Sequence, residues 1–311
     1  MTQVAHFRKA RRRHTATGLA AIALIFSFAD AAAKEHPAAA QAEERPPIAV
    51  IAHRGGALLR PENTLPAFRH AEALGVEFLE FDMEMTADDR IVVYHDAAIN
   101  PDFCKAGTGS AATPAPVRKL DFAAIQKLDC GSGVRPQYAG ARFVAAPGAH
   151  IPELGEVLRA FRGSKAHFFA ETKIPKDADV DPVKFATLLE AAVRDNGLED
   201  RLILQSFDFR TIDALHRINP RIRTCLLGVP RQTRDYLAAL REHHASCIVL
   251  GHDEVDSVET RRLQDAGITV FSGVADDEGQ WRKYTGLGVD AIFTNDPEGV
   301  IEFLRRAGLR D

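Results

Sequence analysis

Two histidines of this 311-residue chain stand directly after short apolar runs. His53 follows residues 48–52 and precedes Arg54 and two glycines, and His95 follows residues 92–94. We interpret both runs as buried strands, which would place the two imidazoles at strand ends, where they can reach a substrate. Because the unperturbed pKa of histidine is near neutral, such a pair can act as general acid and general base.

Three carboxylates could form a cation site. Glu80 and Asp82 are two residues apart in an apolar run, so they would share one face of a strand. Their apolar neighbours predict a buried face, and two buried carboxylates repel each other unless a cation or a proton lies between them. Glu171 ends a similar run and can complete the site. Hard oxygen ligands select Mg²⁺ or Ca²⁺; the alternative is a pair of exposed strand carboxylates.

Two basic residues accompany these groups. Lys173 follows the third carboxylate by two residues, and Arg54 is adjacent to the first histidine, so both could bind an anion. A metal, two fixed cations and two histidines predict hydrolysis of a phosphate ester, because the cations stabilise charge on the phosphorus oxygens and the imidazoles transfer protons. Asn63 or Thr64 is expected to cap the helix that follows, and Asn63 is also expected to support the site. Glu62 could reach the metal or cap the helix.

The spacing of apolar runs predicts the fold. Nine runs alternate with amphipathic stretches: 48–52, 78–83, 91–94, 167–171, 202–205, 224–228, 247–250, 268–271 and 291–294. Residues 84–90 are too few for a parallel crossover, so 91–94 should fold back as a hairpin. Eight parallel strands remain, which predicts an α/β fold, a (β/α)8 TIM barrel over 47–311, with functional residues at the carboxyl ends of the strands. A doubly wound open sheet is the alternative, but no G-x-G-x-x-G follows the first run.

One segment interrupts the alternation. Residues 97–150 contain five prolines and many glycines and alanines, and we expect them to form an inserted lobe over one end of the barrel. Cys104 and Cys130 flank part of this insert and could form a disulfide in an oxidising compartment. Cys225 and Cys247 lie in apolar runs and are expected to be buried thiols.

The N-terminal residues have the order of an export signal. A basic stretch at 8–13 precedes an apolar run at 19–28 and an Ala-rich segment, so we interpret 1–33 as a signal peptide and 34–46 as a disordered lead-in. The apolar run is shorter than the ~20 residues that span a bilayer, so we expect no stable membrane span in the mature protein. Periplasmic or secreted localisation follows. The net charge of -4 offers no bulk basic surface for nucleic acid.

Taken in order, these stretches resemble the glycerophosphodiester phosphodiesterase family. The similarity follows Ala52-His53-Arg54-Gly55, Pro61-Glu62-Asn63-Thr64, Glu80-Phe81-Asp82, His95-Asp96, Leu128-Asp129-Cys130-Gly131-Ser132, Glu171-Thr172-Lys173 and residues 288–297. The resemblance implies a (β/α)8 barrel with a small insert after the His-Asp motif. It also implies that the two histidines are the acid/base pair, that the three carboxylates hold one divalent cation, Ca²⁺ or Mg²⁺, and that Arg54 and Lys173 contact phosphate. The implied reaction releases glycerol 3-phosphate and an alcohol from a glycerophosphodiester.

Two other functions fit parts of the sequence. A phospholipase D-type enzyme acting on lysophospholipids or sphingolipids could use the same barrel, and it would need a wide apolar mouth around Phe103, Tyr138 and Phe143. A non-catalytic barrel could bind phosphodiesters without cleaving them, but it would not need His53 and His95. The intact set of polar residues therefore favours a small-molecule glycerophosphodiester as the substrate of a phosphoric diester hydrolase.

Overall fold

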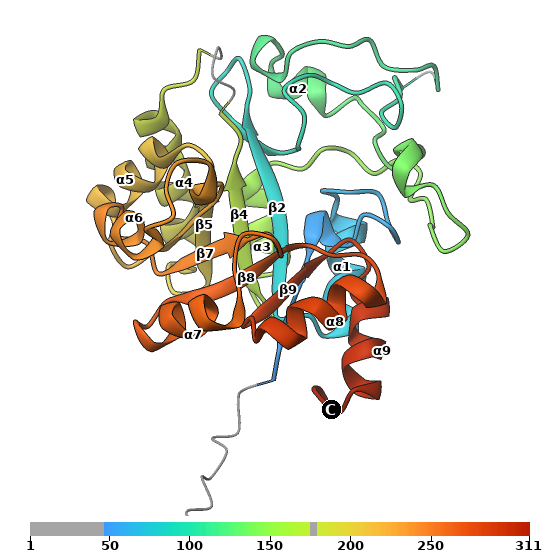
Figure 1. Cartoon of the computed structure of the whole chain (residues 1–311). Helices are drawn as coiled ribbons and strands as arrows, with labels where there is room; N and C mark the ends of the chain where they lie inside the picture. The colour runs from blue at the N-terminus through green and yellow to red at the C-terminus, as the bar shows by residue number, and fades with distance from the viewer. Residues whose placement is uncertain (1–46, 108, 175–178) are drawn as a thin grey trace, which may run out of the picture. The chain divides into compact units, whose positions relative to one another are not determined.

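The computed structural model describes residues 47–107, 109–174 and 179–311, and within them eight parallel strands form a closed barrel. The sheet closes because β1 (Ala49–Ala52) pairs with both β2 (Phe78–Met85) and β9 (Ala291–Thr294). The other barrel strands are β4 (His167–Thr172), β5 (Leu202–Ser206), β6 (Arg223–Leu226), β7 (Cys247–Leu250) and β8 (Thr269–Val274). The predicted (β/α)8 barrel is therefore confirmed (Figure 1).

The one strand outside the barrel forms the predicted hairpin with β2. Among the described strands, β3 (Ile91–Val93) pairs with β2 and runs antiparallel to it, with Met83 opposite Val93, and its Val92 also forms a single bridge with Glu153. The signal peptide and the lead-in that the sequence predicts lie outside the residues that the structure describes. Among those it does describe, no helix has the length and apolar character needed to cross a bilayer.

Helices cover the barrel between consecutive strands (Figure 1). They are α1 (Leu65–Leu74), α3 (Leu154–Ala160), α4 (Pro182–Asn196), α5 (Phe209–Ile218), α6 (Tyr236–Glu242), α7 (Ser257–Asp265), α8 (Glu278–Leu287) and α9 (Pro297–Arg306). The first helix shows how local sequence sets its bounds: the side chain of Thr64 accepts a hydrogen bond from the backbone N–H of Ala67, and Gly75 ends the helix at φ 79°. Of the two expected caps, Asn63 and Thr64, the structure shows Thr64.

Apolar side chains fill the space inside the barrel. This inner core consists of Ile51, Phe169, Ile203, Cys225, Cys247, Phe271, Ala291 and Phe293. Cys225 and Cys247 lie directly opposite each other on β6 and β7, with 4.5 Å between their Cα atoms, and the structure joins them in a disulfide. The two cysteines are buried, as expected, but they are paired and are not free thiols. Sequence spacing does not reveal the register that brings the two neighbouring strands together.

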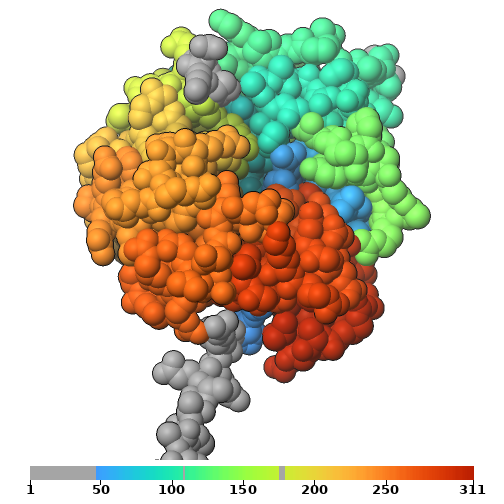
Figure 2. Space-filling view, in the orientation of Figure 1, coloured from blue at the N-terminus to red at the C-terminus, as the bar shows by residue number. Residues whose placement is uncertain are grey.

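The segment 97–150 carries little regular structure. It contains α2 (Phe122–Ile125), two 3₁₀ turns and a disulfide between Cys104 and Cys130. A small apolar cluster of its own, which includes Ile99, Phe103 and Val117, packs against Val92 and Tyr94 of the hairpin. In Figure 1 this insert, in cyan to green, lies beyond the carboxyl end of β2, and Figure 2 shows it beside the first residues of the barrel, in blue.

Candidate active site

The three predicted carboxylates come together at the carboxyl ends of two adjacent strands. Glu80 and Asp82 are on β2, Glu171 is on β4, and the parallel register places Asp82 opposite Glu171. All three side chains are buried, and one oxygen of each lies within 4.8 Å of the others. Buried carboxylates this close repel each other, so the cluster has the donor chemistry of a site for a hard divalent cation.

Hydrogen bonds fix the orientation of these carboxylates. Glu80 accepts from the backbone N–H of Arg54 at 2.6 Å and from Nε2 of Gln205 at 3.1 Å. Asp82 accepts from Nδ2 of Asn63 at 2.8 Å, while its own backbone N–H donates to Oδ1 of the same amide. Oε1 of Gln205 is buried without a hydrogen-bond partner, which leaves one more oxygen donor beside the cluster. These features fit a bound cation.

Burial and neighbouring charges act on the three carboxyl groups in different ways. Burial raises the pKa of Glu80 well above its ordinary value, and the charges of Asp82 and Glu171 raise it further. Burial also raises the pKa of Glu171, against the opposing charge of Lys173. For Asp82 the effect of burial is outweighed by Lys173 and Arg54, which hold its pKa well below the ordinary value. A divalent cation would relieve the repulsion among all three.

Two fixed cations flank the cluster. Nζ of Lys173 is 2.5 Å from Oε1 of Glu171 and 3.1 Å from Oδ1 of Asp82. Nε of Arg54 is 3.2 Å from Oδ2 of Asp82, on a backbone turn where Arg54 has φ 52°. This turn brings α1 so close that a Cβ on Gly55, itself at φ 80°, would lie 2.8 Å from the Cβ of Ala67. Both cations are therefore placed to bind an anion beside the carboxylates.

His53 is half-buried and held by an amide. Its Nδ1 lies 2.8 Å from Oδ1 of Asn295, and its ring is 5.0 Å from that of Phe293. Because an amide oxygen only accepts, Nδ1 carries the proton and Nε2 is left with its lone pair. Burial, followed by the charge of Arg54, lowers the pKa of His53 from 6.5 to about 3. His53 is thus a neutral imidazole, suited to accept a proton.

His95 is held by a carboxylate instead. Its Nδ1 lies 2.7 Å from Oδ1 of Asp96, the next residue. Burial would raise the pKa of Asp96, but hydrogen bonds from His95 and Asn100 and the charge of Arg135 outweigh it and hold that pKa below its ordinary value. Because an ionised carboxylate only accepts, Asp96 takes a hydrogen bond from Nδ1 and orients the ring of His95. The neighbours of the two histidines both touch Asp82: the backbone N–H of Tyr94, before His95, donates to the backbone oxygen of Asp82 at 2.9 Å, and Arg54, after His53, pairs with its carboxylate.

The two supporting residues take other roles than helix capping. Asn63 bonds Asp82 through both ends of its amide, as described above. Glu62 accepts a hydrogen bond from Nη1 of Arg54 at 3.1 Å and is not part of the carboxylate cluster. Asn63 therefore orients a carboxylate, and Glu62 orients a guanidinium.

Four further residues of the site were not predicted from the sequence. They are Glu84, Gln205, Arg135 and Asn295. The alternation that paired Glu80 with Asp82 also predicts Glu84 on the same face, and this residue is buried on β2. Gln205 and Asn295 stand at strand ends, a position that could have identified them. For Arg135, in the insert, no sequence signal exists.

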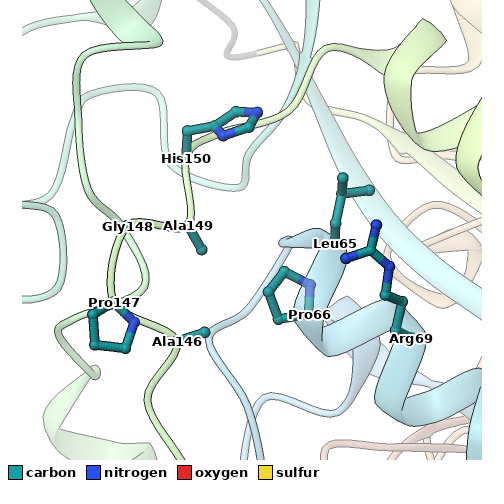
Figure 3. Close-up of a pocket in the computed structure, with 8 residues that line it drawn as sticks. All are labelled: Leu65, Pro66, Arg69, Ala146, Pro147, Gly148, Ala149 and His150. Carbon is teal, nitrogen blue, oxygen red and sulfur yellow. The ribbon is translucent and has the colours of Figure 1, made fainter.

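A cavity of about 340 Å³ lies apart from these groups, between α1 and residues 146–150. Leu65, Pro66 and Arg69 of the helix face that segment across it (Figure 3). None of the predicted catalytic, metal-binding or phosphate-binding residues lines this cavity.

Comparison with known proteins gives consistent matches. Residues 53–299 match the sequence model of the glycerophosphoryl diester phosphodiesterase family. The chain is 28% identical over 259 residues to the glycerophosphodiester phosphodiesterase of Caldanaerobacter subterraneus, covering 83% of this chain and 98% of that protein. A Bacillus subtilis glycerophosphodiester phosphodiesterase is 26% identical over 256 residues, covering 81% and 84%. The crystal structure of a candidate glycerophosphoryl diester phosphodiesterase from Silicibacter pomeroyi superposes with a TM-score of 0.79 at 27% identity, covering 86% and 96%.

Proposed function

Since the chain belongs to the glycerophosphoryl diester phosphodiesterase family, and is thus a phosphoric diester hydrolase, we propose that it releases glycerol 3-phosphate by metal-dependent acid/base catalysis with His53 and His95. The observation that carries the proposal is the arrangement around Asp82. Three buried carboxylates and two fixed cations meet at Asp82, and the two differently supported imidazoles belong to residues whose chain neighbours contact Asp82.

In this proposal Glu80, Asp82 and Glu171 hold one divalent cation, Ca²⁺ or Mg²⁺. When bound, the cation supplies positive charge that stabilises negative charge on the phosphoryl oxygens. Arg54 and Lys173 bind the same phosphoryl group from the protein side and fix its orientation. Their own contacts to Asp82 keep both cations in place before the substrate arrives.

The two imidazoles take opposite roles because their partners differ. His53, neutral and with Nε2 free, accepts the proton of the attacking hydroxyl, which belongs either to the glycerol part or to water. His95, beside ionised Asp96, donates a proton to the oxygen of the departing alcohol. If the glycerol hydroxyl attacks first, water then opens the cyclic phosphate with the roles reversed.

The test combines activity with metal binding. His53→Ala and His95→Ala should each lower kcat by ~10²- to 10⁴-fold while Mg²⁺ or Ca²⁺ binding, measured by calorimetry, stays within a few-fold of wild type. Glu171→Gln should instead weaken that binding. Wild-type turnover by His53→Ala would overturn the assignment of roles, and unchanged calorimetry in Glu171→Gln would overturn the cation site.

The insert argues against a lysophospholipid or sphingolipid substrate. Phe103, Tyr138 and Phe143, the residues expected around a wide apolar mouth, surround a cavity of only about 10 Å³. These three residues therefore do not form the wide apolar mouth that a lipid chain would need at this place. The described residues therefore favour deacylated glycerophosphodiesters.

We further propose that the protein is exported. Two features support this: the basic and then apolar order of the N-terminal residues, and the disulfide between Cys104 and Cys130, a bond typical of oxidising compartments. Fractionation of expressing cells, followed by sequencing of the mature N-terminus, tests the proposal. Protein confined to the cytosol with its first residues intact would contradict it.

A further inference from the structure

Arg135, in the insert, bridges two carboxylates that no metal or substrate role explains. Its Nε lies 2.7 Å from Oε2 of Glu62, and its Nη2 lies 2.9 Å from Oδ2 of Asp96. The side chain of Arg135 is only 11% exposed. A largely buried arginine that forms ion pairs with two carboxylates holds them close together, because its planar guanidinium spreads one positive charge over both contacts.

Each of the two carboxylates also binds one side chain of the proposed reaction. The other oxygen of Glu62 accepts from Nη1 of Arg54 at 3.1 Å, and the other oxygen of Asp96 lies 2.7 Å from Nδ1 of His95. One guanidinium therefore connects the supports of a phosphate-binding cation and of a proton donor. Without it, two carboxylates would face each other with no cation between them and would repel.

The insert holds Arg135 in place through close packing. The guanidinium carbon lies 4.6 Å from the centre of the Phe103 ring. A Cβ on Gly133 would lie 2.5 Å from the Cα of Phe103, so only glycine allows these backbone segments to touch. Cys104, which follows Phe103 in the sequence, forms a disulfide with Cys130, which lies shortly before Gly133. The disulfide and the glycine together fix the segment that carries Arg135.

We propose that Arg135 is a positioning residue through which the insert orients His95 and Arg54. This inference rests on the proposed function, in which these two side chains donate a proton and bind the phosphoryl group. In this role the insert supplies the central cation of a row of ion pairs, Arg54–Glu62–Arg135–Asp96–His95.

The experiment compares Arg135→Met with a matched arginine of the same insert. Arg118 pairs with Asp89 and donates to the backbone oxygen of Thr86, away from the carboxylate cluster, so Arg118→Met is the control. We expect Arg135→Met to lower kcat by ~10- to 100-fold, the size of effect that follows misplacement of a reacting group, while the control stays within about 2-fold. Arg135→Lys should recover little, because an ammonium cannot bridge both carboxylates.

A double-mutant cycle separates positioning from general destabilisation. If Arg135 acts through Asp96, then Arg135→Met should cost less than about 3-fold in an Asp96→Asn background, because coupled residues are not additive. Millimolar guanidinium, but not equal urea, should partly restore Arg135→Ala. Additive losses, or no rescue, would overturn the proposal.

A readout independent of turnover separates this inference from the proposed function. The proton on Nδ1 of His95, hydrogen-bonded to Asp96, should give a downfield NMR signal in the wild type and Arg118→Met, and the signal should be lost in Arg135→Met. An inactive wild type that shows this pattern would contradict the proposed function and support the positioning role. A signal that persists in Arg135→Met would overturn the positioning role.

Discussion

Glu84 should destabilise the protein at neutral pH, and its replacement by glutamine should stabilise it. The side chain is 4% exposed, and its Oε1 has no hydrogen-bond partner. Burial raises the pKa of Glu84 from 4.5 to about 9, despite the nearby charge of Lys173. The carboxyl is therefore protonated in the folded protein at pH 7 but ionised in the unfolded chain.

The size and sign of the effect follow from proton linkage. Below pH 4.5 the carboxyl of Glu84 is protonated in both the folded and the unfolded protein, so it lowers the stability no more than glutamine would. As the pH rises toward about 9, the unfolded chain gains stability by releasing this proton and the folded protein does not. At pH 7 the solution is about 2.5 pH units above the ordinary pKa of 4.5, and at about 1.4 kcal/mol per unit the wild-type fold is less stable than Glu84→Gln by about 3.5 kcal/mol.

Urea unfolding in EDTA, followed by the fluorescence of the single buried Trp281, measures the effect. Glu84→Gln should unfold at higher urea than wild type at pH 7, with a difference that nearly vanishes at pH 4.5. Glu302→Gln is the control, because it changes the same groups on a side chain that is 69% exposed. Equal stability of Glu84→Gln and wild type at pH 7, or a difference independent of pH, would refute the reasoning.

Three further predictions concern the site and the insert. Asn295→Ala should lower kcat by ~10- to 100-fold with little change in KM, since it releases Nδ1 of His53; an unchanged kcat would show that the amide does not orient the ring. Lys173→Met should raise KM but tighten Mg²⁺ binding in calorimetry, because it removes a positive charge 3.1 Å from Asp82; weaker binding would count against this. Cys104→Ser removes a disulfide with a sequence separation of 26 and should lower the free energy of unfolding by about 3 kcal/mol. The insert should then be cleaved faster by a protease, and equal rates of cleavage would contradict the prediction.

Much of the barrel was predictable because its strands are short, apolar and regularly spaced. The same alternation placed Glu80 and Asp82 on one face, and the short link to residues 91–93 required a hairpin. The carboxyl ends of parallel strands meet at one rim, so Glu171 could be added to the cluster although it is far away in sequence.

The remaining features depend on contacts that have no local pattern. The strand-end position of Asn295 could mark it as a site residue, but its contact with His53, which is 242 residues away, cannot be read from the sequence. Arg135 sits in irregular backbone, where neither period nor cap fixes a direction. Cys225 and Cys247 pair through the register of two strands, which the apolar runs do not specify.

The most direct test of the proposed activity measures glycerol 3-phosphate released from glycerophosphodiesters with several head groups and from matched lysophospholipids, with and without EDTA. The account predicts release from at least one glycerophosphodiester, loss of that release in EDTA, and its recovery when excess Mg²⁺ or Ca²⁺ is added. No release from any glycerophosphodiester would contradict the proposed substrate. Release that persists in EDTA would contradict the role given to Glu80, Asp82 and Glu171.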